Sequence, residues 1–446
     1  MRRQAAPLAT PDPSLNVLIV CDHASARFGG EAILPLHYFR LLRDRGFRVW
    51  LVAHARTRAE LSELFPDEPR IRYVEDTLAH KLLWRIGERL PGKIDYLTTG
   101  FAARVMVQIA LRRIVRSLVA SEGIDIVHQP TPVSPREPSL IYDVGAPVVI
   151  GPMNGGMDYP PAFRRERGWI EQLLLRFGRT SAAWLNALMP GKQRAALLLV
   201  ANARSHNALP AGVCAQVEEL VENGVDLELW HPPHADPLSP VGASGVTRFA
   251  FVGRLLGLKA VDLLLEAFAI ASARAPMRLV IIGDGEERKR LIAQARALFP
   301  TPPADAGDAP VRFTGWLPQT VCARELAEVD CLVMPSLHDC GGAVVLEAMS
   351  MSKPVIATAW GGPLDYLDDS CGILIEPRDR QALVQGFAQA MLRIANSPQE
   401  RVTMGRAARR KIEDHYDWDA KGRHILHLYR QVLRAQTMPA ASVASV

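Results

Sequence analysis

Residues 335–362 read PSLHDCGGAVVLEAMSMSKPVIATAWGG, and the interpretation of the whole chain starts from this stretch. Two carboxylates, Asp339 and Glu347, lie eight positions apart with a pair of glycines between them. A helix beginning near Gly342 would point its free backbone N–H groups at an anion, because helix N-termini bind phosphate. Glu347, about one helical turn further along, could accept two hydrogen bonds from a ribose diol. The alternative is an acidic loop followed by an ordinary buried helix.

Short apolar segments on both sides of this stretch are typical of buried parallel strands. We expect helices over 261–274 and 286–299, and strands over 247–253, 278–283, 311–315, 331–335, 354–358 and 372–375. This alternation predicts a parallel α/β sheet. Ligands of such sheets bind outside the carboxyl ends of the strands.

The first half of the chain has the same organisation. A helix over 31–45 closes at Gly46, basic helical segments follow between residues 78 and 121, and strands are expected over 16–21, 47–53, 124–128 and 147–151. A stretch dense in Pro, Gly and Ser, His231 to Gly245, separates the halves. Since 446 residues exceed what one core can serve, two α/β domains are predicted.

The composition is that of a soluble globular protein, with 48% apolar and 22% charged residues. No apolar run reaches the roughly 18 residues of a membrane-spanning helix, and the residues after Arg2 and Arg3 lack the apolar core of a secretion signal. A cytoplasmic protein is therefore expected. The six cysteines show no paired spacing, which argues against zinc and disulfides. A net charge of +5 fits nucleotides, anionic lipid or nucleic acid alike.

The segment Phe251-Val-Gly-Arg254-Leu-Leu-Gly-Leu-Lys259 places two cations five residues apart at a strand end. Such a pair suits a diphosphate, because charge-assisted hydrogen bonds to phosphate are short and strong. The alternative is a solvated loop, although Gly253 and Gly257 would permit close approach of the backbone. Gly283-Asp-Gly285 lacks the third glycine of a dinucleotide fingerprint and is interpreted as a tight strand-to-helix turn.

Several motifs follow one another along the C-terminal half: Asn223-Gly-Val-Asp226, Phe251-Val-Gly-Arg254, Lys259, Gly283-Asp-Gly285, Gly315, and the segment from Asp339 to Thr358. Together they resemble the retaining GT-B glycosyltransferases of family 4, the glycosyl transferases of group 1. The resemblance implies two Rossmann-like parallel-sheet domains facing a central cleft, with a C-terminal helix that packs back across them. It divides the chain into a flexible tail (1–14), an acceptor domain (15–222), a nucleotide-sugar donor domain (223–405) and a C-terminal helical segment with its tail (406–446).

The resemblance also assigns roles in the donor half. Arg254 and Lys259 would bind the diphosphate and assist catalysis, Glu347 would hold the ribose, and Asp339 would face the donor sugar as a catalytic acid. The family usually has Glu where this chain has Asp339. The remaining donor-binding positions are the loop amides and glycines at Gly253, Gly283, Gly341, Gly342, Ala343 and Val344.

In the acceptor half, the glycines Gly29 and Gly30 would approach the diphosphate from the opposite side. His128 matches a family position that lines the reacting centre, but a histidine at a strand end is more often a structural hydrogen bonder. The loop from Gly151 to Gly156 is placed beside the cleft by its position alone.

The implied function is transfer of a hexosyl group from a nucleotide-diphosphate sugar to a glycan, lipid-linked or small-molecule acceptor, with retention of anomeric configuration, in polysaccharide or glycoconjugate biosynthesis. No metal and no cofactor is expected, since the two cations and the helix-start amides would stabilise the leaving group. Asp417-Trp-Asp419 is interpreted as a pair of helix-start acids. Two alternatives stay open: a nucleotide-sugar-binding protein that performs no transfer, and a sugar phosphorylase, which would need a pyridoxal-phosphate lysine.

The segment from Phe101 to Ala120 holds Arg104, Arg112, Arg113 and Arg116 and contains no acid. A basic amphipathic helix can lie on an anionic membrane, and peripheral contact of that kind would suit a lipid-linked acceptor. The alternative is a solvated face over a stripe packed on the core. No nucleic-acid partner is expected.

Overall fold

The computed structural model describes residues 15–27, 30–90, 94–95, 98–166, 182–232, 245–300 and 309–437. By its internal contacts the chain divides into two compact units. The described residues of the N-terminal unit lie within 15–156, 182–222 and 422–437, and those of the C-terminal unit lie within 157–166 and 223–421.

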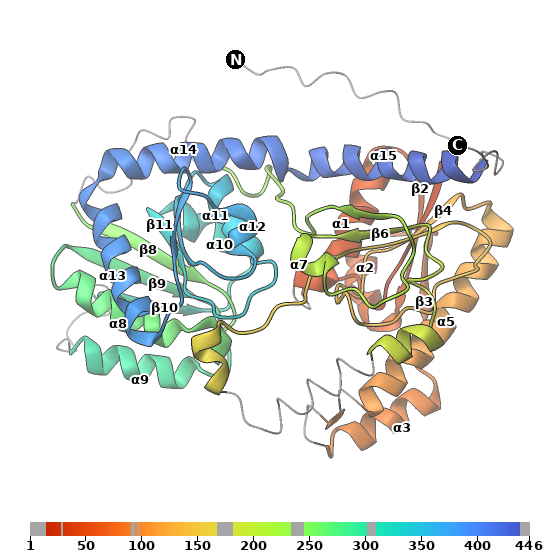
Figure 1. Ribbon diagram of the computed structural model, residues 1–446, viewed down its shortest axis with the longest axis horizontal. Helices are drawn as coiled ribbons and strands as arrows, with labels where there is room; N and C mark the ends of the chain where they lie inside the picture. The colour runs from red at the N-terminus through yellow and green to blue at the C-terminus, as the bar shows by residue number, and fades with distance from the viewer. Residues whose placement is uncertain are drawn as a thin grey trace, which may run out of the picture. The chain divides into compact units, whose positions relative to one another are not determined.

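The N-terminal unit is built on a seven-stranded sheet in the order β3-β2-β1-β4-β5-β6-β7, and each neighbouring pair is parallel. Its strands are β1 (Asn16–Val20), β2 (Arg48–His54), β3 (Ile71–Val74), β4 (Ile126–Gln129), β5 (Val148–Met153), β6 (Leu197–Val200) and β7 (Val217–Glu219). The helices α1 (Gly30–Asp44), α2 (Arg58–Leu64), α3 (Leu78–Gly87), α5 (Thr99–Glu122) and α7 (Ala203–His206) accompany them, with a short η1 (Ala55–Thr57) (Figure 1).

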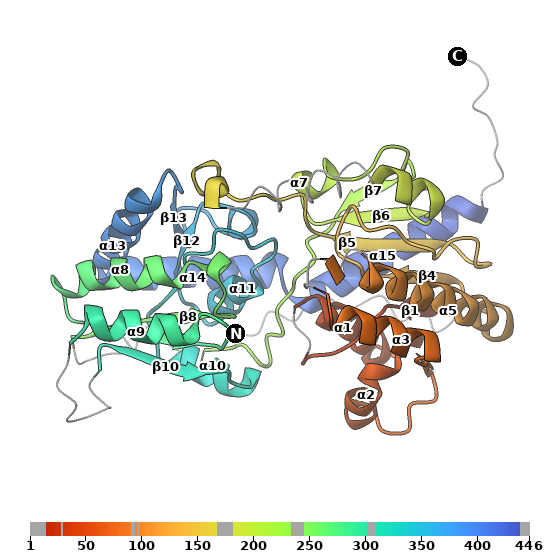
Figure 2. The same cartoon turned by 90° about the horizontal axis from the view of Figure 1, so that it is seen from below.

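The C-terminal unit contains a six-stranded parallel sheet in the order β10-β9-β8-β11-β12-β13. Figures 1 and 2 show α8, α9 and α13 together on one side of it and α11 on the other. The strands are β8 (Thr247–Val252), β9 (Met277–Ile282), β10 (Val311–Gly315), β11 (Cys331–Met334), β12 (Val355–Thr358) and β13 (Gly372–Ile375). The helical segments are η2 (Pro161–Glu166), η3 (Gly257–Lys259), α8 (Val261–Ser272), α9 (Arg288–Leu298), α10 (Gln319–Ala327), α11 (Ala343–Ser350), α12 (Pro363–Tyr366), α13 (Arg380–Asn396) and α14 (Pro398–His415).

Each unit has its own hydrophobic core. The strands β4, β6, β11 and β12 are buried along their whole length, as expected for parallel strands covered on both faces. In the N-terminal unit, Leu18 pairs with Trp50 on one side and Val127 on the other, and all three are buried. The apolar runs visible in the sequence are therefore the central strands of two sheets.

The predicted strands and helices are all present, most with bounds shifted by one or two residues. The short strands β3, β6 and β7 were not predicted. Asp419 lies in the first turn of α15 (Trp418–Thr437), which confirms the interpretation of Asp417-Trp-Asp419 as a helix start. The predicted N-terminal tail and residues 233–244 of the predicted linker lie outside the described residues.

Two segments belong to a unit that their position in the sequence does not indicate. Residues Gly422 to Thr437 belong to the N-terminal unit, where the Tyr429 hydroxyl donates to Nδ1 of His128 at 2.7 Å. The segment from Met157 to Glu166 belongs to the C-terminal unit, where Phe163 is buried in the core and the Trp360 indole donates to the Asp158 carbonyl. No described helix is long and apolar enough to cross a membrane.

Candidate active site

The carboxyl ends of the strands in the C-terminal unit bring the main predicted residues to one edge of its sheet. Arg254 follows β8, Gly283 follows β9, Asp339 follows β11, and Gly361 follows β12. Because all six strands are parallel, their carboxyl ends share this edge, where ligands of open α/β sheets bind.

Lys259 and Asp339 form an ion pair at this edge, between side chains that are 19% and 15% exposed. The loops that carry them are also joined by a backbone hydrogen bond, in which the Leu337 N–H donates to the carbonyl of Leu258, the residue before Lys259, at 2.9 Å. Arg254 is exposed and has no ion pair within the described part of the chain. One cation is therefore held by an acid, and the other is available to an anion.

The start of α11 lies beside this ion pair. Gly342 is its N-cap residue and has φ +66°, and a Cβ atom built on Gly342 would lie 3.8 Å from the Asp339 carboxyl carbon. The first N–H groups of a helix have no partner within it, so Gly341, Gly342, Ala343 and Val344 lie where backbone donors point outward. The loop is fixed from behind, because the Gly362 N–H donates to the Asp339 carbonyl at 2.8 Å.

Glu347 lies one turn into α11 and shares a helix face with Ala343. Its side chain is half-buried, and within the described residues its carboxylate has no hydrogen bond or ion pair. Burial raises the pKa of Glu347 to about 7. Burial and the nearby Glu347 carboxylate also raise the pKa of the Cys322 thiol, on α10, to about 12. A partly buried acceptor without a protein partner is suited to hydrogen bonding ligand hydroxyls.

Trp316 follows the last residue of β10 and is 70% exposed. Trp316 was not among the predicted site residues, although an aromatic residue directly after a strand-ending glycine was a visible signal. An exposed indole can stack on a nucleobase.

The glycines of the β8 and β9 loops are explained by packing of one backbone on another. A Cβ atom on Gly283, which has φ +139°, would lie 1.9 Å from the Gly253 carbonyl oxygen. A Cβ atom on Gly285 would lie 2.4 Å from the Leu255 carbonyl oxygen. A side chain at Gly283 would therefore meet the protein's own backbone. The donor-binding roles predicted for Gly253 and Gly283 stay predictions.

His128, predicted as catalytic, is fully buried in the N-terminal unit. Its Nδ1 accepts from the Tyr429 hydroxyl, so its Nε2 carries the proton and donates to the Gly151 carbonyl at 2.6 Å. Burial lowers the pKa of His128 to about 4. With both ring nitrogens engaged, it has the geometry of a structural hydrogen bonder, and we leave it out of the mechanism proposed below.

Of the two predicted glycines near the first strand, Gly30 begins α1 and Gly29 lies outside the described residues. The loop from Gly151 to Gly156 is closely packed at both ends. A Cβ atom on Gly151 would lie 2.2 Å from the Leu199 carbonyl oxygen, and one on Gly156 would lie 2.5 Å from the Ala208 Cβ. These contacts give both glycines a packing role.

The N-terminal unit also contains a polar cluster whose residues were not predicted as site residues. Asp22, His54 and Asp76 lie at the carboxyl ends of β1, β2 and β3, and the His54 Nε2 lies 3.3 Å from the Asp76 carboxylate. Arg104 pairs with Glu137 at 3.0 Å. Burial and the nearby Glu137 carboxylate raise the pKa of Asp22 to about 7. The available signal was their position, since three of these residues lie where a strand ends.

The arginines of the predicted basic helix, α5, divide into two pairs. Arg104 pairs with Glu137, and Arg112 donates to the Tyr142 carbonyl and lies over the Tyr142 ring. Arg113 and Arg116 are exposed. Half of the basic face is therefore used inside the unit.

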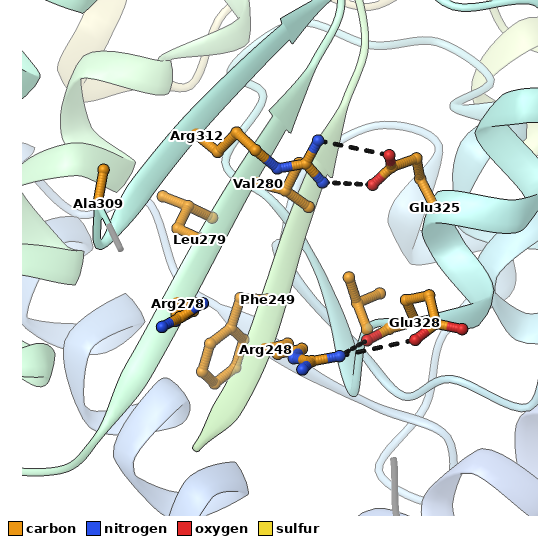
Figure 3. Close-up of a pocket in the computed structure, with 10 residues that line it drawn as sticks. Arg248, Phe249, Arg278, Leu279, Val280, Ala309, Arg312, Glu325 and Glu328 are labelled. Carbon is orange, nitrogen blue, oxygen red and sulfur yellow. Dashed lines mark hydrogen bonds and ion pairs between the residues drawn. The ribbon is translucent and has the colours of Figure 1, made fainter. Parts of the chain in front are cut away.

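A pocket of about 210 Å³ in the C-terminal unit lies near the amino ends of β8, β9 and β10, away from the carboxyl ends that carry Arg254 and Asp339 (Figure 3). Arg312 pairs with Glu325 and Arg248 with Glu328 across it. Because these charges already pair, the pocket is not assigned to the donor.

No group of three His, Cys, Asp or Glu side chains in the described ranges is placed to hold a metal ion. All six cysteines are free thiols.

Comparison with known proteins identifies the domain that contains this edge. The family described as glycosyl transferases group 1 matches residues 246–396. The chain contains a glycosyl transferases group 1 domain. Arg254, Lys259, Asp339 and Glu347 all lie within it.

Curated relatives of the group 1 domain include a D-inositol 3-phosphate glycosyltransferase from Kribbella flavida, which is 33% identical over 239 residues, or 50% of this chain and 52% of that protein. A glycogen synthase from Mycobacterium tuberculosis is 25% identical over 282 residues, or 62% of each chain. The chain spans about half the length of the D-inositol 3-phosphate glycosyltransferases that it matches.

Solved structures with the same fold cover nearly the whole chain. Anabaena HepE, solved in complex with UDP, aligns with TM-score 0.62 and 16% identity over 94% of this chain and 100% of that one. WaaG, a glycosyltransferase involved in lipopolysaccharide biosynthesis, aligns with TM-score 0.59 and 17% identity over 92% and 99%. The predicted GT-B fold class, with two Rossmann-like parallel-sheet units, is confirmed.

Proposed function

We propose that this protein transfers a hexosyl group from a nucleotide-diphosphate sugar to an acceptor hydroxyl, with retention of anomeric configuration, as a member of family 4. The observation that carries the proposal is the edge of the C-terminal sheet. There the Lys259–Asp339 pair, the start of α11 and the unpartnered Glu347 carboxylate lie on connected elements of the group 1 domain.

The donor diphosphate would lie against Arg254, Lys259 and the amides from Gly341 to Val344. These groups would stabilise the negative charge that develops on the leaving phosphate. Lys259 would then be shared between the diphosphate and Asp339, which leaves the Asp339 carboxylate facing the donor sugar. Glu347 would accept hydrogen bonds from the ribose diol, and Trp316 offers a surface for the base.

In the proposed step the acceptor hydroxyl oxygen attacks the anomeric carbon on the face that the leaving group occupies. The bond from that carbon to the diphosphate oxygen breaks, and a phosphate oxygen takes the acceptor proton. Retention follows from this front-face geometry. We propose that the step needs neither a metal nor a cofactor, because Arg254, Lys259 and the helix-start amides supply the positive charge. Activity that survives prolonged chelation would support this, and activity restored by a divalent cation would refute it.

We assign the acceptor, a glycan, a lipid-linked sugar or a small molecule, to the N-terminal unit. The Asp22 and Asp76 carboxylates lie at the carboxyl ends of its strands and would accept hydrogen bonds from acceptor hydroxyls. The buried His54 ring, whose Nε2 lies 3.3 Å from the Asp76 carboxylate, would position that carboxylate. Such groups are suited to a polyhydroxylated ligand.

The test is a panel of UDP-, GDP- and ADP-sugars scored by thermal stabilisation, followed by product analysis with the stabilising donor. Arg254→Ala should weaken nucleotide diphosphate binding by about 1.5 to 3 kcal/mol and affect the monophosphate less, since it removes a charged hydrogen-bonding group. Equal losses for the two ligands would remove the diphosphate assignment. An inverted product anomer would refute retention.

The panel also separates the two alternatives. A nucleotide-sugar-binding protein would be stabilised by a donor but would give neither transfer nor hydrolysis. A sugar phosphorylase would turn over sugar 1-phosphate in place of the nucleotide sugar.

A further inference from the structure

The helix α3 leaves most of its surface exposed. It packs on α5, with His80 and Gly87 buried on the contact side, and Figure 1 shows it beside α5 in the N-terminal unit. The large apolar side chains on its other sides are open to solvent: Leu78 is 85% exposed, Trp84 68% and Leu82 60%. Single exposed apolar residues are ordinary, but several on one ten-residue helix form a patch.

The exposed side chains of α3 form two adjacent stripes. Leu78, Leu82 and Ile86 are spaced four residues apart and therefore follow one face of the helix. Lys81 and Arg85 have the same spacing and lie beside that face, and Arg89 follows just after the helix. None of these three cations has an acidic partner in the described ranges, and the only acid between 78 and 90 is Glu88.

An apolar stripe beside a row of unpaired cations complements one surface in particular. We propose that the exposed face of α3 binds an anionic lipid bilayer, with Leu78, Leu82 and Ile86 in the interface and the cations at the headgroups. Long basic side chains can lay their stems on apolar surface while the charged ends reach phosphate. A second protein copy would gain nothing from the cations, since like charges would meet. The proposal does not depend on transferase activity.

The proposal moves the predicted membrane contact from α5 to α3. Arg104 and Arg112 of α5 are held by groups of the protein itself, and the exposed Arg113 and Arg116 have only Ile109, 39% exposed, as a large apolar residue on the same helix. The described structure therefore offers apolar insertion on α3 and not on α5.

The test is co-sedimentation of the full chain with vesicles of phosphatidylcholine alone and of phosphatidylcholine mixed with phosphatidylglycerol. Three double variants separate the contributions: Leu78→Gln with Leu82→Gln removes apolar area at constant charge, Lys81→Gln with Arg85→Gln removes charge from α3, and Arg113→Gln with Arg116→Gln removes the same charge from α5. All six side chains are exposed, so thermal unfolding of each variant should match the parent.

We expect the parent to bind the anionic vesicles at low salt. Each α3 variant should bind them at least about tenfold more weakly than the parent. The α5 variant should bind like the parent, and high salt should reproduce the effect of the Lys81 and Arg85 changes. Three results would overturn the proposal: no binding by the parent at low salt, equal loss in the α5 variant, or a dimer that the leucine changes dissociate in a parent that does not bind lipid.

Discussion

At the scale of single residues, the ion pair between Lys259 and Asp339 changes what a substitution at Asp339 should do. In the protein without ligand, the carboxylate holds the cation that the diphosphate is proposed to use. Asp339→Asn should therefore leave nucleotide diphosphate affinity equal to or tighter than the parent's, because Lys259 is released. Turnover should fall by about a hundredfold or more, because a charge that faces developing positive character is lost. Titration calorimetry and initial rates measure the two effects separately.

Asp339→Glu is the matched control, since it keeps the charge and gives the side chain that is usual in the family that this motif resembles. It should retain turnover, because the negative charge that faces the donor sugar is kept. If Asp339→Asn instead works at the parental rate, Asp339 is not the sugar-facing acid.

The raised pKa of Glu347 predicts a pH dependence of nucleotide binding. Burial raises the pKa of its carboxyl group from the ordinary value of 4.5 to about 7 in the folded protein. The ionised form is the better acceptor for two ribose hydroxyls, so affinity should weaken as pH falls through about 7. The limit is about tenfold for each pH unit. Glu347→Gln should bind more weakly at high pH and should show no such dependence.

The raised pKa of Glu347 also makes the stability of the fold depend on pH, but stability falls as pH rises, whereas nucleotide affinity increases. Below pH 4.5 the group is protonated in both states and contributes nothing; as pH rises toward 7, folding must keep the proton or bury a charge, and stability is lost. Glu347→Gln should therefore stabilise the protein at pH 8 by an amount on the order of 1 to 3 kcal/mol and have little effect at pH 4. Denaturant unfolding at the two pH values measures this; equal effects at both would contradict the assigned pKa.

Residue types that suit phosphate and ribose were recognisable from the sequence, because Arg254, Lys259, Asp339 and Glu347 follow strand ends or lie on the next helix. Pairings between distant segments were not. The residues around His128 in the sequence do not indicate that its ring is hydrogen bonded to a tyrosine 301 positions away. The Lys259–Asp339 pair spans 80 positions and depends on two loops that only the sheet brings together.

At the scale of elements, the turn after β9 shows a packing role for Gly283 that its sequence context did not reveal. Gly283→Ala should destabilise the protein by on the order of 3 kcal/mol, because the residue has φ +139° and the new methyl group would meet the Gly253 carbonyl. The fraction that folds should bind nucleotide with nearly parental affinity. Thermal unfolding and titration of the folded protein test the two halves of this statement.

The neighbouring Gly257 is the control for that experiment. A Cβ atom there meets nothing within 4 Å, and its φ is not positive, so Gly257→Ala should be tolerated. A Gly283→Ala protein of parental stability that had lost nucleotide binding would instead give Gly283 a role at the ligand.

Elements with a continuous apolar run could be predicted, and those without one could not. The strands β11 and β12 are four residues long and wholly buried, so their sequences are uniformly apolar. The strand β3 alternates between buried and exposed residues over only four positions, and β7 has three residues, two of them exposed glutamates. Such short segments contain too few residues to show either the two-residue alternation of a strand or the 3.6-residue period of a helix.

At the scale of the whole molecule, the C-terminal helix shows a limit of periodicity. The apolar positions Ile425, Leu428 and Val432 predicted a buried helix face, and all three are buried. The spacing of apolar residues predicts that this face of the helix is buried, but it does not identify the residues that pack against it. The contacts answer this, because Gly422 packs on Leu41 and Tyr429 reaches His128, both in the N-terminal unit.

This attachment predicts a stability effect far from the proposed donor site. Tyr429→Phe removes the donor to His128 Nδ1 and leaves a buried acceptor unsatisfied, which should cost about 1 to 3 kcal/mol in the free energy of unfolding. Affinity for nucleotide diphosphate should not change, because its proposed ligands all lie in the C-terminal unit.

Tyr416→Phe is the matched comparison, since that largely buried hydroxyl donates to the Asp365 carbonyl at 3.0 Å within the C-terminal unit. The two hydrogen bonds share no partner, so the losses in the double variant should add. Denaturant unfolding of the parent, both single variants and the double variant measures all four stabilities. A Tyr429→Phe protein as stable as the parent, beside a destabilised Tyr416→Phe protein, would mean that the His128–Tyr429 contact does not hold the C-terminal helix to the N-terminal unit.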